Sequence, residues 1–150
     1  MTTSVTLPDT IGVQPWMTLP ATRAVIEALE ARGFAGCARF VGGCVRNTLL
    51  KQPIDDVDIA TTLTPDQVTE ALEAAGIKVL PTGVDHGTLT AVSGGRTYEV
   101  TTLRKDVSTD GRRAVVAYST RIEDDARRRD FTMNALYADR HGIVIDPLHG

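Results

Sequence analysis

The feature that most constrains the fold is a pair of strand-like segments joined by a double glycine. The segments GTLTAVS and TYEVTTLR are rich in β-branched residues, and only the glycines 94–95 and Arg96 separate them. A two-residue glycine turn joins neighbouring antiparallel strands, so this stretch predicts a β-hairpin. ARFV, DVDIAT and IKVLP predict further strands. Several strands close together, with few helices, favour an α+β fold with a small mixed or antiparallel sheet over a doubly wound parallel sheet.

Helices are predicted on both sides of these strands in the sequence. The clearest is TLTPDQVTEALEAAG, in which Thr64 caps, Pro65 takes the first helical position and Gln67 completes a capping box. PATRAVIEALEARG predicts an amphipathic helix, VRNTLLK a short one and EDDARRRDFTMNALYAD a last one. The polar stretch 104–119 predicts a mobile loop. The helices are expected to cover one face of the sheet, which leaves the other face available for a site.

Composition bounds the class of protein. A chain of 150 residues with 42% hydrophobic and 23% charged residues predicts one globular domain. No apolar run approaches about 18 residues, so no membrane span is expected. The first residues lack a basic start and an apolar core, which makes a secretory signal unexpected and predicts an N-terminal arm over residues 1–19. Cys37 and Cys44 do not form a CxxC pair, and we interpret them as reduced thiols of a cytoplasmic protein.

Charge is unevenly distributed along the chain. The net charge of −3 argues against a general nucleic-acid coat protein. However, acids cluster at residues 55–58, whereas three arginines stand together at residues 127–129. Such a pairing of an acidic cluster with a basic one suits a metal-bound polyphosphate better than a bare nucleic-acid backbone.

The acidic cluster lies on a predicted strand. Alternate side chains of a strand share a face, so Asp56 and Asp58 are expected on one side, about 7 Å apart, with Asp55 pointing away. Two carboxylates this close need a partner for their charge, and hard oxygen ligands at this spacing suit Mg²⁺. A calcium loop is excluded because Ala60 and Thr61 stand where its further ligand and glycine would be.

Glu99 is a candidate third carboxylate. The two-glycine turn places it across from Thr90, on the face opposite Tyr98. A single acid on a strand can equally be a solvated surface residue. If Glu99 shares a face with Asp56 and Asp58, the three carboxylates could hold two cations, as in phosphoryl and nucleotidyl transfer.

Two further motifs suit an anionic ligand. In FVGGCVRN, Gly42 and Gly43 stand between a strand and a helix, where backbone amides can approach a phosphate, and Arg46 could add a charged contact. The motif is neither GxxxxGK[ST] nor GxGxxG, and a tight turn without a ligand is the alternative. In RRRDFTMNAL, Asp130 and Asn134 share a helical face with Arg127; the alternative there is a solvated run of charges.

Together, the four ordered motifs GG-x-V-R-N-x-L-L, D-V-D-I-A-T, E-V-T-T-L-R and R-R-D-F-T-M-N-A resemble the catalytic head of the class II tRNA nucleotidyltransferases. That family includes CCA-adding enzymes and bacterial poly(A) polymerases, within the polymerase-beta-like nucleotidyltransferases. The resemblance runs from about residue 40 to residue 150. It implies a head domain over residues 20–150, of a longer protein whose helical neck, body and tail regions are absent from this chain.

The resemblance also implies roles for individual residues. Asp56 and Asp58 would bind two Mg²⁺ ions, and Glu99 stands where the family often has its third carboxylate. The nucleotide would be held by the following residues: Gly42, Gly43, Arg46, Arg128, Arg129, Asp130 and Asn134. The segment from Lys105 to Ser119 matches the family's flexible loop. Asn47 departs from the family, which usually has an aspartate at this position, so the ion pair expected there is in question.

The function implied is transfer of a nucleoside monophosphate from ATP, or from CTP and then ATP, to an RNA 3′ end, most simply that of a tRNA. Two alternatives stay open at this point. The head alone could bind metal and triphosphate without turnover. A DxD glycosyltransferase using a nucleotide sugar is the other, against which the glycine–arginine motif and RRDFTMNA both argue.

Overall fold

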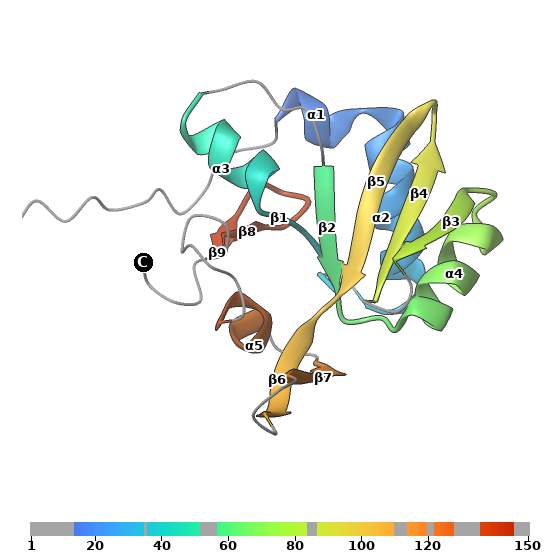
Figure 1. The fold of residues 1–150 in the computed structure, drawn as a ribbon. Helices are drawn as coiled ribbons and strands as arrows, with labels where there is room; N and C mark the ends of the chain where they lie inside the picture. The colour runs from blue at the N-terminus through green and yellow to red at the C-terminus, as the bar shows by residue number, and fades with distance from the viewer. Residues whose placement is uncertain are drawn as a thin grey trace, which may run out of the picture.

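The central feature of the fold is a seven-stranded sheet with the strand order β3-β4-β5-β2-β1-β8-β9 (Figure 1). The computed structural model describes residues 14–34, 36–51, 57–83, 87–109, 114–119, 122–127 and 136–145. The strands of the sheet are β1 (Ala38–Val41), β2 (Val57–Thr61), β3 (Lys78–Gly83), β4 (Thr88–Ser93), β5 (Arg96–Thr102), β8 (Tyr137–Ala138) and β9 (Val144–Ile145). Within the described residues β2 and β5 pair in parallel, and the other strand pairs of this sheet are antiparallel. The α+β fold with a mixed sheet is therefore confirmed.

The hairpin that the double glycine predicted is β4–β5. Ser93 pairs with Arg96 and Thr90 with Glu99, which is the register expected for a two-residue turn. Gly94 has φ of 56°, a left-handed conformation that favours glycine. A Cβ at Gly94 would also lie 2.8 Å from the Cβ of Ala21, so the turn is packed closely against α2 (Pro20–Arg32).

Helices α2 and α4 (Pro65–Ala74) cover one face of the sheet (Figure 1). The predicted capping box of α4 is present: Gln67 N donates to Thr64 Oγ1 at 3.4 Å, and Thr64 N donates to Gln67 Oε1 at 3.0 Å. Buried apolar residues of both helices join those of the sheet in the main hydrophobic cluster, which includes Val25, Leu29, Phe40, Ile59, Val68, Leu72, Leu89 and Val100. None of the described helices is long and apolar enough to cross a membrane.

The described end of the expected N-terminal arm packs on this core. Residues 15–18 form α1 (Pro15–Thr18), in which Met17 is buried and the Trp16 ring meets Phe40 edge-on, with ring centroids 4.8 Å apart. Trp16 Nε1 also donates to Thr48 Oγ1 at 3.1 Å, which ties α1 to α3 (Gly43–Leu49). The hydrogen bond from Trp16 to Thr48 therefore holds α1 against α3; residues 1–13 lie outside the described residues.

Two sequence predictions are corrected by the structure. The stretch predicted as a mobile loop contains a second, two-stranded sheet of β6 (Arg104–Thr109) and β7 (Ala114–Tyr118), because the β-branched runs at either end of it pair with each other. The last predicted helix is described as α5 (Ile122–Arg127), and Tyr137 and Ala138, which were predicted to belong to it, form β8 instead. Pairing with β1 places these two residues in the sheet despite the helix-like pattern before them.

Candidate active site

The candidate site lies on the sheet face opposite α2 and α4. Asp58 on β2 pairs with Glu99 on β5 in parallel register, whereas their neighbours Ile59 and Val100 belong to the helix-covered core. Since side chains alternate along a strand, Asp58 and Glu99 both point to the face that α2 and α4 do not cover. The two strands that carry them are about 4.8 Å apart. The structure thus brings together two of the three predicted carboxylates.

These carboxylates line a cavity of about 260 Å³. Its lining residues are Val57, Asp58, Thr90, Thr97 and Glu99. Glu99 is exposed and Asp58 half-buried, so the cavity presents carboxylate and hydroxyl oxygens to a ligand from solvent. Oxygen donors with two adjacent negative charges fit a hard divalent cation such as Mg²⁺.

The third predicted carboxylate, Asp56, lies just before β2 and outside the described residues. Among the residues that the structure does describe, no group of three or more His, Cys, Asp and Glu side chains is placed to hold a metal ion. The joining of Asp56 to Asp58 and Glu99 therefore stays a prediction from the alternation of the strand.

The turn at Gly42 and Gly43 lies next to Asp58. Val41, the last residue of β1, pairs with Asp58, and α3 begins two residues later at Gly43. Gly42 has φ of 77° and ψ of −130°, a backbone conformation that glycine alone adopts readily. Its N–H donates to the carbonyl of Leu136 at 3.3 Å, so this amide is already used within the fold. The turn thus places the start of α3 beside the acidic cavity.

Arg46 lies over this turn. A Cβ on Gly43 would be 3.5 Å from Arg46 Nη2, so the guanidinium lies close to the first turn of α3. Arg46 Nε donates to Asn47 Oδ1 at 3.2 Å. Asn47 therefore accepts a hydrogen bond from Arg46 at the position where an aspartate would form an ion pair.

Cys44 is a supporting residue that sequence reasoning missed. Its Sγ donates to the carbonyl of Val41 at 3.5 Å and lies 4.0 Å from that of Asp58. Burial raises the pKa of the Cys44 thiol to about 11, so it is a neutral donor. The thiol joins α3 to β1 and β2, and only its place next to Gly42 and Gly43 signals this role in the sequence.

The predicted nucleotide-contacting residues Arg128, Arg129, Asp130 and Asn134 lie outside the described residues. Helix α5, which leads into them, is described as far as Arg127. Its Ala126 packs with Val41, Ala60, Leu103 and Tyr137 in a second hydrophobic cluster, on the same sheet face as Asp58. Part of the face that was expected to be open is therefore covered by α5, and the stretch from residue 128 starts from there.

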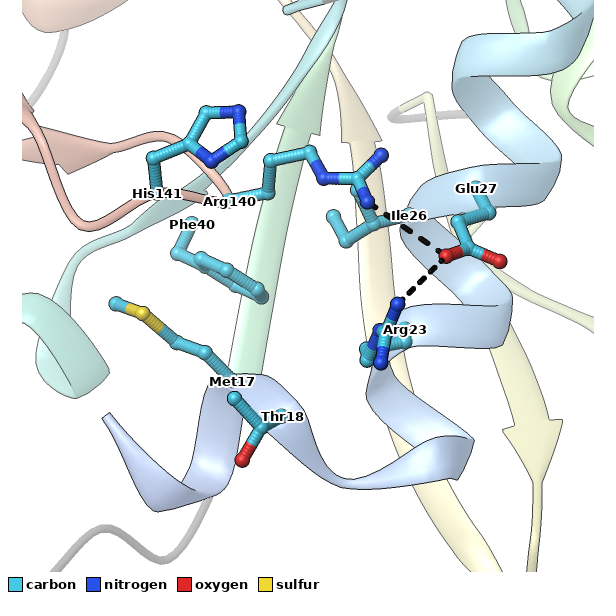
Figure 2. A pocket seen from close by; sticks show the side chains of 8 residues that line it. All are labelled: Met17, Thr18, Arg23, Ile26, Glu27, Phe40, Arg140 and His141. Carbon is cyan, nitrogen blue, oxygen red and sulfur yellow. Dashed lines mark hydrogen bonds and ion pairs between the residues drawn. The ribbon is translucent and has the colours of Figure 1, made fainter. Parts of the chain in front are cut away.

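A second cavity, of about 180 Å³, lies on the helix-covered side of the sheet (Figure 2). It lies between α1, α2, the Phe40 ring and the turn at Arg140 and His141. Arg140 pairs with Glu30 at 2.9 Å and with Glu27 at 3.6 Å, and Arg23 pairs with Glu27 at 3.5 Å. The charged side chains of this cavity thus form ion pairs with one another or with Glu30. The sheet lies between this cavity and the one at Asp58.

The chain is similar to proteins of known family. A family model described as "Poly A polymerase head domain" matches residues 38–150. The chain is 45% identical, over 128 residues, to the CCA-adding enzyme of Oceanobacillus iheyensis, covering 84% of this chain and 30% of that protein. It is 46% identical to the CCA-adding enzyme of Lactobacillus delbrueckii subsp. bulgaricus, with coverage of 84% and 31%. The chain thus spans less than a third of these relatives.

Solved structures give the same answer. The CCA-adding enzyme of Bacillus stearothermophilus in complex with CTP superposes with a TM-score of 0.72 at 39% identity, over 89% of this chain and 31% of that one. A tRNA nucleotidyltransferase complexed with a primer tRNA and an incoming ATP analog superposes with a TM-score of 0.54 at 28% identity, over 73% of this chain and 30% of that one. None of these four proteins is described as a nucleotide-sugar transferase.

Proposed function

This chain belongs to the family of poly A polymerase head domains, and we propose that it is the catalytic head of a longer RNA nucleotidyltransferase. The reaction is transfer of CMP or AMP from the nucleoside triphosphate to an RNA 3′-hydroxyl, with release of pyrophosphate. The favoured acceptor is a tRNA that lacks its 3′ end, because the similar proteins are CCA-adding enzymes.

The observation that carries the proposal is the register of Asp58 with Glu99 beside the glycine turn. A nucleotidyl transfer site needs acidic oxygens for a cation at the reacting phosphate and a basic, amide-rich cradle for the remaining phosphates. The two carboxylates supply the first, and the start of α3 with Arg46 lies next to them and suits the second.

In this proposal Asp58 and Glu99, together with Asp56, hold Mg²⁺. When bound, Mg²⁺ lowers the pKa of the attacking hydroxyl and stabilises charge on the leaving phosphates. The chain's own residues fix the geometry: Gly42 shapes the turn, Gly43 leaves room for close approach, and Arg46 contacts the triphosphate. Arg128, Arg129, Asp130 and Asn134 complete the contacts to the nucleotide.

The test is incorporation of labelled CTP and ATP into tRNA lacking its 3′ end by the full-length protein that contains this chain. We expect incorporation that depends on Mg²⁺ and stops when the divalent cation is chelated. The competing function is a head that binds nucleotide without turnover. It remains an alternative because this chain covers only 30% of the relative's length. Mg²⁺-dependent nucleotide binding with no incorporation by the full-length protein would favour that competing function.

A further inference from the structure

The cavity at Asp58 extends beyond the two acids onto β4 and β5. Thr90 on β4 and Thr97 on β5 line it together with Asp58 and Glu99. Thr97 precedes Glu99 by two residues of the strand, so both side chains point to the face that α2 and α4 do not cover, about 7 Å apart. Thr97 is exposed, whereas Thr90 is buried. The cavity therefore presents the Thr97 hydroxyl to a ligand, and the proposed function gives this hydroxyl no role.

The strands that carry the two hydroxyls lie on one side of β2, and α3, where the triphosphate is proposed to bind, lies on the other (Figure 1). In the sheet β2 lies between β5 and β1, and β4 lies beyond β5. Asp58 of β2 pairs with Glu99 of β5 and with Val41 of β1, and α3 begins two residues after Val41. The order across the sheet is therefore hydroxyls, acids, first turn of α3.

Nucleotidyl transfer constrains which substrate lies on each side. The attacking oxygen and the leaving oxygen lie roughly in line, on opposite sides of the reacting phosphorus. With that phosphorus over the acids and the leaving phosphates toward α3, the attacking 3′-hydroxyl comes from the side of β5 and β4. The last ribose of the acceptor then lies over Thr97, and its 2′-hydroxyl, next to the attacking one, needs a hydrogen-bond partner there.

A positive charge lies farther along the same face, toward the edge of the sheet. Lys78 on β3 pairs with Val92, which pairs with Thr97. Its neighbour Val79 packs against the helix-covered core, so Lys78 points to the same face as Thr97, and it is exposed. The two residues are two strands, or about 10 Å, apart. An ammonium group at this place suits a backbone phosphate of an RNA strand that ends at the cavity.

We propose that the Thr97 hydroxyl binds the 2′-hydroxyl of the acceptor's last nucleotide and thereby selects an RNA end over a DNA end. This inference rests on the proposed function. A threonine hydroxyl donates one hydrogen bond and accepts others, and a ribose 2′-hydroxyl does the same, so the two groups are complementary in either direction. Thr97 is thus a specificity residue for the acceptor and leaves the incoming nucleotide to the α3 side.

The experiment measures kcat/KM for two acceptors with the full-length protein at saturating CTP and ATP. One acceptor is tRNA lacking its 3′ end; the other is the same tRNA with a 2′-deoxy last nucleotide, which keeps its 3′-hydroxyl. We expect the deoxy end to lower kcat/KM of wild type about threefold to tenfold, the effect of losing one hydrogen bond between neutral groups. Thr97→Val, which replaces the hydroxyl by a methyl group, should cause a similar fall with the normal tRNA and no further fall with the deoxy tRNA.

Two variants control for effects of the substitution itself. Thr101→Val makes the same change on the same strand and face but outside the cavity, where the Thr101 hydroxyl lies 3.1 Å from that of Thr88. This variant should distinguish the two acceptors as wild type does. Thr97→Ser keeps the hydroxyl and should also keep the distinction. If Thr97→Val does not fold, Thr97→Ala removes the same hydroxyl and decides the question.

The outcomes separate this inference from the proposed function. A folded Thr97→Val protein that distinguishes the two acceptors as strongly as wild type overturns the inference alone, as does a wild type that treats them equally. Discrimination between CTP and dCTP that disappears in Thr97→Val, while that between the acceptors persists, would assign the hydroxyl to the incoming nucleotide instead. A wild-type protein that adds nucleotides to neither tRNA overturns the proposed function and this inference with it.

Discussion

At the scale of single residues, side chains along β2 and β5 point alternately to the candidate site and to the hydrophobic core. Asp58 and Glu99 point to the cavity, whereas Ile59, Tyr98 and Val100 point into the helix-covered core. The face of Glu99 could be deduced from the sequence because the hairpin register follows from its two-residue turn. The adjacency of Glu99 to Asp58 could not, since a parallel pairing between β2 and β5 has no local signal in either segment.

Directly behind Glu99, Tyr98 makes a buried hydrogen bond that stabilises the fold. Its hydroxyl lies 2.7 Å from Thr22 Oγ1 on α2, and both residues are almost fully buried. Tyr98→Phe leaves the Thr22 hydroxyl unpaired, so we expect the free energy of unfolding to fall by about 1–3 kcal/mol in urea titrations. The double variant with Thr22→Val removes both partners and should recover part of that loss; a Tyr98→Phe protein as stable as wild type would contradict this role.

At the scale of elements, those with strong local signals could be predicted and those that depend on distant partners could not. Helix α4 carries its own capping box and the β4–β5 turn its own glycines, so both form as the sequence indicates. The β6 and β7 strands and the two-residue β8 are defined by pairing. The polar composition around β6 and β7 and the helical pattern that continues into β8 gave no sign of this pairing. Tertiary contacts override local propensity in both places.

The β4–β5 turn offers a test of an element through one glycine. Gly94→Ala introduces a side chain at φ of 56° and places its Cβ 2.8 Å from that of Ala21, so either the turn or α2 must shift. We expect a loss of about 2–3 kcal/mol in unfolding free energy, measured by thermal or urea denaturation. Gly95→Ala is the matched control: its φ is also positive, at 78°, but no atom lies within 4 Å of the added Cβ. Equal losses for the two variants would refute the packing argument.

At the scale of the whole molecule, burial couples stability to pH through Cys37. Burial raises the pKa of this thiol above its ordinary value of 9.0, so the fold favours the neutral form. Its contribution to stability is fully present below pH 9 and is lost as the pH rises above it, because the unfolded chain ionises first. We expect the unfolding free energy of wild type to fall more steeply above pH 9 than that of Cys37→Ala; parallel pH profiles would contradict this.

The described parts of the predicted site lie at one end of the sheet. The start of α3 lies beside the strand that carries Asp58, with α1 next to α3, while the β6–β7 hairpin lies at the opposite end (Figure 1). The sequence motifs predict which residues belong to the site, because the chemistry of their side chains is local. The supporting contacts of Cys44 and Trp16 are visible only once the strands are paired.

The central claim is that the face carrying Asp58 performs nucleotidyl transfer, and the rate of nucleotide addition by Asp58→Ala tests it most directly. The full-length variant should show the thermal unfolding transition of wild type, because Asp58 lies at the cavity rather than in the core. Its single-turnover addition of CMP or AMP to tRNA lacking its 3′ end should be abolished. A folded Asp58→Ala protein that adds nucleotides at a rate near that of wild type would remove this residue from the chemistry and contradict the account.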